Sequence, residues 1–264
     1  MQQIALSQGR VEYRWSGPHR SGLRDAGLPV IVLLHEGLGC VAMWKDFPEL
    51  LAQATGLPVL AYSRVGYGGS DPCILPRPLG YMHEEGERHL PELLSALGIQ
   101  RHILVGHSDG ASIALVYAGA APPDGLLGVA VMAPHSFCED VSVASIQAAD
   151  RAYAETDLRV RLARYHGDNV DCAFRGWCDA WLHPDFRRWN IEAHVARIMV
   201  PVLVIQGEDD EYGTVAQVDS VADRVQGRVQ TLLLPACGHS PHRDQPDATV
   251  SALQRFVGEF SLRG

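Results

Sequence analysis

Gly106-His107-Ser108-Asp109-Gly110 is the stretch that decides the fold of this 264-residue chain. It follows an apolar run, 103–105, that is typical of a buried strand, and it precedes 111–119, which has the composition of a helix. A G-x-S-x-G between a strand and a helix predicts a sharp turn, in which the glycines let neighbouring backbones approach closely. Such a turn presents the serine hydroxyl at the edge of a sheet, near the amino end of the helix.

Short apolar runs alternate with longer segments of helical period on both sides of this stretch. The alternation predicts an α/β fold, with a mostly parallel central sheet flanked by helices. All runs but the first are nearly continuous in Val, Ile and Leu, which predicts strands covered on both faces. The predicted strands are 10–15, 30–34, 58–62, 102–105, 126–132, 202–206 and 229–234. The predicted helices are 41–54, 82–97, 111–119, 215–225 and 246–260.

The alternation stops after Ala133 and resumes at Pro201. Residues 134–199 contain helical segments without a convincing strand, so they predict a helical cap inserted over the sheet. The core domain then consists of residues 1–133 and 200–264. The cap holds three of the five tryptophans, which either form its own core or line a pocket above the serine. The pocket candidates are His135, Phe137, Trp177 and Trp181.

Composition and charge disfavour several classes of protein. Apolar residues make up 47% of the chain and charged residues 20%, which is typical of a globular domain. The net charge of −9 and the absence of basic runs disfavour nucleic acid and anionic membranes as partners. No apolar stretch has the length of a signal peptide or of a membrane span. We therefore expect a cytoplasmic protein that acts on a small molecule, and the sequence is compatible with a homo-oligomer.

The cysteines and histidines do not form a recognisable metal or redox motif. The six cysteines are scattered along a long chain, which predicts reduced thiols. No paired CxxC, no HExxH and no cluster of histidines at ligand spacing occurs, so we expect no metal and no other cofactor. Side chains alone therefore have to supply the chemistry.

A serine hydroxyl is a weak nucleophile, and it needs a histidine base that a carboxylate holds in one tautomer. The predicted strand 202–206 is followed by Gly207-Glu208-Asp209-Asp210-Glu211, and the strand 229–234 by Pro235-Ala236-Cys237-Gly238-His239. An acid and a histidine thus follow the serine in order, each at the carboxyl end of a strand. The pattern predicts Ser108 as nucleophile, His239 as base, and Asp209 or Asp210 as the acid.

These motifs together resemble the α/β-hydrolase superfamily, over nearly the whole chain outside the cap. The stretch 35–39, His-Glu-Gly-Leu-Gly, looks like the family's His-Gly loop, and 64–70, Arg-Val-Gly-Tyr-Gly-Gly-Ser, looks like its R-x-G-x-G-x-S turn. Residues 207–210 are similar to its G-x-x-D acid turn, and 238–242 to its G-H-x-x-H segment. The pattern is nearest to carboxylesterase and enol-lactonase-like members.

The resemblance implies a serine hydrolase that cleaves a small carboxylic ester or lactone through an acyl-enzyme. The family spacing favours Asp210 over Asp209 as the acid of the triad. The backbone amide of Asp109 would be one oxyanion donor, and that of Gly37 or Leu38 the other.

Four further polar side chains lie in or beside these motifs. We expect His35 to brace the oxyanion loop from below, His107 to pack or hydrogen-bond locally, and His242 to support the site. Glu36 occupies a position where the family usually has a second glycine. A carboxylate there could repel anionic substrates, and the sequence does not indicate which way it points.

Other activities remain open on the same fold. Thioesterases, carbon–carbon bond hydrolases and cofactor-free peroxidases use a similar triad. Epoxide hydrolases and dehalogenases are disfavoured, because they resemble this fold but have Asp where this chain has Ser108. The alternative from another class is a ligand receptor that kept the fold without catalysis.

Overall fold

The computed structural model describes residues 1–17, 28–120 and 124–261. Its centre is an eight-stranded sheet of order β1-β2-β4-β3-β5-β6-β7-β8. β1 and β2 pair antiparallel, as do β2 and β4, and all other neighbours are parallel. The predicted α/β fold is thereby confirmed. The strands are β1 (Gln2–Leu6), β2 (Gly9–Ser16), β3 (Val30–Leu34), β4 (Val59–Tyr62), β5 (His102–His107), β6 (Leu126–Met132), β7 (Val202–Gly207) and β8 (Val229–Leu234).

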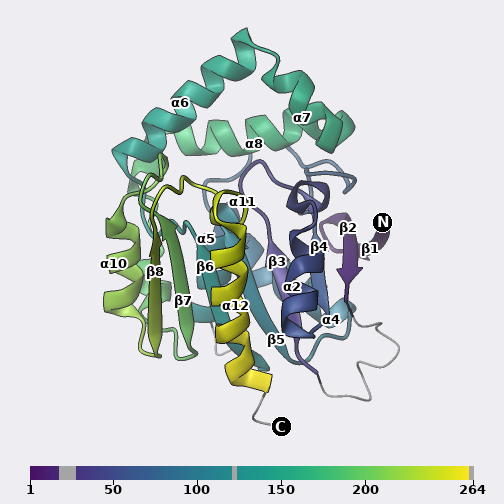
Figure 1. Ribbon diagram of the computed structural model, residues 1–264. Coiled ribbons are helices and arrows are strands. Elements are labelled where there is room, and N and C mark those ends of the chain that lie inside the picture. Colours follow the sequence, from purple (N-terminus) through teal and green to yellow (C-terminus); the bar gives the residue numbers. More distant parts are fainter. Residues whose placement is uncertain (18–27, 121–123, 262–264) are drawn as a thin grey trace.

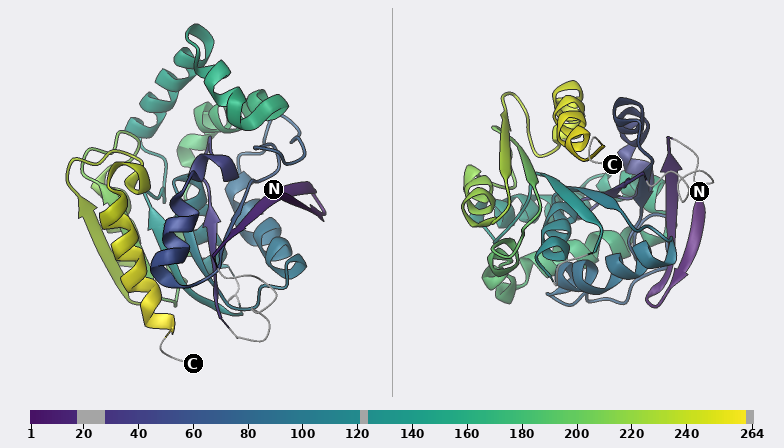
Figure 2. Two further views of the ribbon diagram at one scale, coloured as in Figure 1. Left: turned by 45° about the vertical axis from the view of Figure 1, so that its right-hand side comes forward. Right: turned by 90° about the horizontal axis from the view of Figure 1, so that it is seen from below.

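Helices cover both faces of the sheet (Figure 1, Figure 2). Because successive side chains of a strand point to opposite faces, β3 contributes Ile31 and Leu33 to one core and Val32 and Leu34 to the other. The first core also contains residues of α2 (Phe47–Thr55) and α12 (Pro246–Ser261). The second contains residues of α4 (Leu90–Ala96), α5 (Asp109–Gly119) and α10 (Val215–Arg224). The parallel strands are therefore held between two apolar layers.

The segment between β6 and β7 is helical. It contains α6 (Asp140–Glu155), α7 (Leu158–His166), α8 (Val170–Leu182) and α9 (Glu192–Val195). In Figure 1, α6, α7 and α8 lie beyond the carboxyl ends of the parallel strands. The described residues of this segment include no strand, only an isolated bridge between Phe137 and Asn190. The division into a core and a cap domain stays a prediction.

The two edges of the sheet differ from the sequence-based expectation. β1 has no counterpart among the predicted strands, and its polar residues are accommodated because β2 alone pairs with it. β8 was expected to be covered on both faces. It is the opposite edge strand, and only Leu234 of its residues is buried, because no strand among the described residues pairs with its outer side.

Two predicted helices differ in detail from the structure. The predicted helix 41–54 is a short 3-10 helix, Val41–Trp44, followed by α2, and Lys45 between them has a φ of 54°. The predicted helix 82–97 consists of α3 (Tyr81–Glu84), a π-helical turn and α4. α2 has a proline in its first turn, where the missing N–H costs no hydrogen bond. Pro91 lies in the first turn of α4, directly after the π-helical turn. In the described ranges, no helix is long and apolar enough to cross a membrane.

One pair of cysteines corrects the expectation of reduced thiols. Cys73, in the loop after β4, forms a disulfide with Cys172 of α8, although 99 positions separate them. The fold brings the two sulfurs together, which the spacing in the sequence does not reveal. The bond links the core to the helical segment 134–199.

The turn between β5 and α5 depends on its two glycines. Ser108 has a φ of 53°, a strained value for a residue with a side chain. A Cβ at Gly106 would lie 2.4 Å from the carbonyl oxygen of Gly110, and a Cβ at Gly110 would lie 2.1 Å from that of Leu34. Both contacts are with backbone, which cannot move without displacing β3 or α5. Glycine is therefore required at both positions.

We predict that Gly110→Ala destabilises the fold by about 1–3 kcal/mol, because the added methyl group overpacks against β3. Urea unfolding followed by circular dichroism measures the change. Gly258→Ala is the matched control, since a Cβ at this helical glycine of α12 meets nothing within 4 Å. The control should be neutral or slightly stabilising. Equal stability of the two variants would contradict the argument.

Candidate active site

Ser108, His239 and Asp210 meet at the carboxyl edge of the sheet. They follow β5, β8 and β7 respectively. His239 Nε2 lies 2.9 Å from Ser108 Oγ, and His239 Nδ1 lies 2.8 Å from Asp210 Oδ1. A carboxylate only accepts, so the neutral ring keeps its proton on Nδ1. Nε2 is then free to accept the proton of the serine.

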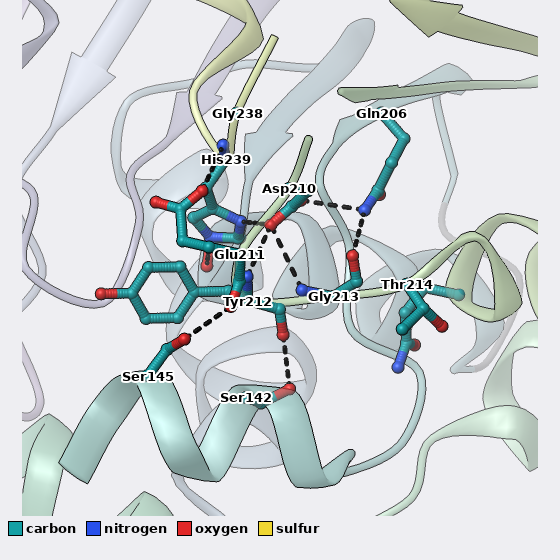
Figure 3. A network of polar contacts seen from close by, with 12 residues as sticks. Ser142, Ser145, Gln206, Asp210, Glu211, Tyr212, Gly213, Thr214, Gly238 and His239 are labelled. Atoms are coloured by element: carbon teal, nitrogen blue, oxygen red, sulfur yellow. Dashed lines mark hydrogen bonds and ion pairs between the residues drawn. The ribbon is translucent and has the colours of Figure 1, made fainter. Parts of the chain in front are cut away.

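The carboxylate of Asp210 is buried in a cradle of donors (Figure 3). Its side chain is 1% exposed. The N–H groups of Tyr212 and Gly213 donate to Oδ1 at 2.8 and 3.2 Å, and Gln206 Nε2 donates to Oδ2 at 2.9 Å. Burial acts to raise the pKa of Asp210, but His239 and the Tyr212 N–H outweigh it and the pKa is lowered. The carboxylate is therefore ionised and oriented toward His239.

The structure distinguishes between the two adjacent acids. Asp210 contacts the imidazole, whereas Asp209 is exposed and its N–H donates to the carbonyl of Cys237 at 2.9 Å. Glu208 is exposed as well, and so is Glu211, although its carboxylate accepts the N–H of His239 at 3.2 Å. The geometry therefore agrees with the family spacing, which favours Asp210.

Two serines of helix α6 form hydrogen bonds with the acid turn (Figure 3). Ser142 Oγ donates to the carbonyl of Tyr212 at 2.5 Å, and Ser145 Oγ donates to that of Glu211 at 2.6 Å. Neither serine nor Gln206 was among the candidate residues. Only the fold brings them to the turn, so no local signal in the sequence could have identified them.

The carbonyl of Glu36 fixes the loop after β3. It accepts from Arg64 Nη2 at 3.0 Å, from His35 Nδ1 at 2.7 Å and from the N–H of Gly39 at 3.1 Å. In a trans peptide the following N–H points the opposite way, so the amide of Gly37 faces away from Arg64. Within the described parts of the chain, the N–H groups of Gly37, Leu38 and Asp109 have no hydrogen-bond partner. These are the three candidate oxyanion donors.

Arg64 and His35 form the underside of this loop, and both are fully buried. Arg64 Nη1 donates to the carbonyl of His35 at 2.6 Å, and the N–H of Arg64 donates to His35 Nε2 at 3.1 Å. Burial and the charge of Arg64 hold the pKa of His35 well below its usual value, so the ring stays neutral. These contacts agree with the expectation that His35 braces the loop, and they add Arg64, whose contribution the sequence did not indicate.

Helix α8 covers both the loop and the elbow. A Cβ at Gly37 would lie 2.3 Å from the indole of Trp177, so this ring packs directly on the loop. Trp181 Nε1 donates to the hydroxyl oxygen of Tyr81 at 3.1 Å and to Asp109 Oδ1 at 3.3 Å, and Tyr81 donates to Asp109 Oδ2. Burial raises the pKa of Asp109 despite these bonds. The helix is thus bonded to the residue that follows the nucleophile.

Three of the four pocket candidates lie at the site. Besides Trp177 and Trp181, His135 is placed there, with its ring centroid 5.7 Å from His239 and 5.1 Å from Trp181. Burial lowers the pKa of His135 to about 3, so this ring is neutral. Phe137 is half-buried, and in the described residues its ring pairs with no other aromatic side chain.

Two further histidines lie near His239: the ring of His107 is next to that of His239, and the ring of His242 is next to that of His107. His107 Nε2 is 2.7 Å from the carbonyl oxygen of His239, a contact across the fold rather than a local one. His242 is 5% exposed and packs on Trp44, Phe47 and His107, consistent with a supporting residue. In the described ranges, no group of His, Cys, Asp and Glu residues is arranged to hold a metal ion.

Comparisons with known proteins agree with this architecture. In sequence, the chain is 25% identical over 261 residues to 2-succinyl-6-hydroxy-2,4-cyclohexadiene-1-carboxylate synthase of Serratia proteamaculans, covering 88% of this chain and 94% of that protein. In structure, it is similar to the enol-lactonase of Burkholderia xenovorans LB400, with a TM-score of 0.74 at 21% identity over 97% of this chain and 100% of the other. An esterase from Rhodococcus gives a TM-score of 0.70 at 18% identity over 97% of both chains.

A family model covers most of the chain. Residues 31–252 match the model of the alpha/beta hydrolase family. The matched range begins in β3 and includes the elbow, the acid turn and the segment that contains His239. The resemblance inferred from the motifs is confirmed at this level, and the chain belongs to the alpha/beta hydrolase family.

Proposed function

We propose that this protein is a serine hydrolase that cleaves a small carboxylic ester or lactone through an acyl-enzyme intermediate. The observation that carries the proposal is the continuous hydrogen-bond chain from Ser108 Oγ through His239 to the buried carboxylate of Asp210. This chain has the geometry that a general base requires, with heavy atoms within about 3.2 Å of each other.

In the first half of the reaction, Ser108 Oγ attacks the carbonyl carbon while His239 Nε2 takes the hydroxyl proton. Asp210 stabilises the imidazolium that forms. The tetrahedral intermediate collapses, the imidazolium gives its proton to the leaving oxygen, and an acyl-serine remains. In the second half, His239 removes a proton from water, the hydroxide adds to the acyl carbon, and Ser108 leaves with the proton as the carboxylic acid is formed.

The backbone amides of Asp109 and of Gly37 or Leu38 would bind the developing oxyanion. Preorganised donors of this kind are worth about 10²–10³ in rate each, because they need no reorganisation during the reaction. The buried guanidinium of Arg64 lies on the carbonyl side of the peptide that precedes Gly37, where a positive charge polarises the N–H toward an oxyanion. This arrangement supports acyl transfer.

The similarity to an enol-lactonase and an esterase supports carboxylic esters or lactones as the substrate class. The relative from Serratia proteamaculans, named as a synthase, makes that reaction the second candidate. Turnover of activated esters and lactones, assayed beside formation of the compound in the relative's name, separates the two. A fluorophosphonate probe distinguishes either enzyme from a non-catalytic receptor, since only a reactive serine is labelled.

We predict that wild-type protein is labelled by a fluorophosphonate at Ser108 alone. Ser108→Ala should abolish labelling and ester hydrolysis while circular dichroism stays unchanged. His239→Ala should cost about as much, because loss of either residue in such a unit lowers kcat by about 10⁶-fold. Retention of more than about a tenth of wild-type kcat in either folded variant would refute the proposed triad.

A second prediction compares the two adjacent acids. Asp210→Asn should lower kcat by about 10⁴-fold, because an amide cannot hold the imidazole tautomer that leaves Nε2 free. Asp209→Asn should lower it less than about tenfold, since an exposed charge contributes at most ~1 kcal/mol. Both variants are measured on one activated ester. A larger loss for Asp209→Asn would exclude Asp210 as the acid.

A further inference from the structure

Glu36 is the residue at which this chain departs from the family's usual glycine, and its carboxylate points to His107 and Arg243. Its Oε2 lies 3.5 Å from His107 Nδ1, and its Oε1 lies 3.4 Å from Arg243 Nη2. The side chain of His107 is 1% exposed and that of Glu36 is 16% exposed. The pair is therefore largely shielded from solvent.

The hydrogen bonds of His107 determine which of its ring nitrogens carry protons. Nε2 lies 2.7 Å from the carbonyl oxygen of His239, and a carbonyl only accepts, so Nε2 carries a proton. Nδ1 lies 3.5 Å from the carboxylate of Glu36, and among the described residues it makes no hydrogen bond. If Nδ1 were bare, two lone pairs would face each other in a buried space.

The contact between Glu36 and His107 Nδ1 is favourable if Glu36 is ionised and Nδ1 carries a proton. Burial acts to raise the pKa of Glu36, but the contact with His107 and the charge of Arg243 outweigh it and hold the pKa well below its usual range. A carboxylate facing Nδ1 requires a proton on that nitrogen. In an ion pair with Glu36, His107 would carry protons on both nitrogens, with Nδ1 facing the carboxylate and Nε2 donating to the carbonyl of His239.

The other titratable groups around His107 are compatible with this charge. The ring centroids of His242 and His239 lie 4.9 and 5.2 Å from that of His107. Burial holds the pKa of His242 well below its usual value, so it adds no second positive charge. Glu36 thus faces the cation Arg243, which is the more exposed, and the buried ring of His107.

We propose that Glu36 and His107 form a buried ion pair that positions His239 for catalysis. The pair connects three segments: the loop that carries the candidate oxyanion donors, the elbow residue before Ser108, and the backbone of the base. A charged donor holds the carbonyl of His239 more firmly than a neutral one, because charge-assisted hydrogen bonds are about twice as strong. This inference rests on the proposed role of His239 as the base.

Histidine-selective ¹⁵N NMR of the wild-type protein tests the ion pair directly. His107→Phe assigns the His107 signals by their disappearance. Two protonated ring nitrogens at His107 at neutral pH support the pair, and one protonated nitrogen overturns it. This measurement depends neither on activity nor on the folding of a Glu36 variant.

Variants of Glu36 test the positioning. In Glu36→Gln the amide can donate to a neutral His107, whose Nε2–H still reaches the carbonyl of His239. We expect this variant to retain kcat within about tenfold and to show one protonated ring nitrogen at His107. Glu36→Ala leaves Nδ1 without a partner, and we expect kcat to fall by about 100-fold with an almost unchanged KM, as for a displacement of about 1 Å.

Two further variants separate positioning from general destabilisation. Glu36→Ala combined with His107→Phe should lose no more than His107→Phe alone, because Glu36 acts only through His107 and residues that act as one unit are not additive. Glu87→Gln is the matched control, since Glu87 pairs with His194 at 2.9 Å near the surface, and its kcat should equal that of the wild type. Equal losses in Glu87→Gln and Glu36→Ala would overturn the proposal.

The test distinguishes failure of this inference from failure of the proposed function. If a fluorophosphonate labels Ser108 in the wild type and labels folded Glu36→Ala at the same rate, the positioning role is refuted alone. If the wild type is not labelled, the proposed function fails. The Nδ1–H signal of His239, which reports its bond to Asp210, then still decides the inference: broadening in Glu36→Ala supports positioning, and an unchanged signal refutes it.

Discussion

The contact between the elbow glycine and the third strand sets the geometry of the whole site. A Cβ at Gly110 would overlap the carbonyl of Leu34, so the backbones of α5 and β3 touch without an intervening side chain. β3 and β5 are also parallel neighbours in the sheet, with Leu34 opposite Gly106. The distance between Ser108 and the loop after β3 is therefore fixed. The positions of Ser108 and of the candidate oxyanion donors depend on this single close approach.

The helical segment 134–199 adds a second set of constraints, because it bonds to several parts of the site at once. Trp181 bonds to Asp109 at the elbow, Ser142 bonds to the acid turn, and the disulfide of Cys172 joins α8 to the loop after β4. Burying charged groups costs several kcal/mol each unless they are paired. The buried charges beneath the helices are accordingly surrounded by donors and acceptors, as the carbonyls around Arg64 illustrate.

The amino-acid sequence by itself determined where the central strands lie along the chain. It also determined that the candidate site residues follow those strands. Runs of Val, Ile and Leu predict the central strands because a parallel strand is apolar on both faces, and β2 to β8 lie within two residues of the predicted ranges. The elbow was predictable because its strand, glycines and helix are contiguous. Ser108 and His239 followed from the same local rule, since Ser108 directly follows β5 and His239 lies in the turn that follows β8.

Only the tertiary structure decided which neighbouring side chains meet. Asp209 and Asp210 are adjacent and chemically alike, and what distinguishes them is contact with a histidine 29 positions away. The direction of the Glu36 carboxylate depends on His107 at the elbow and on Arg243 in the short helix α11 (Pro241–Asp244). The tertiary structure also decided the disulfide between Cys73 and Cys172 and the exposure of the edge strand β8. These features depend on long-range packing, for which a local pattern of residues contains no information.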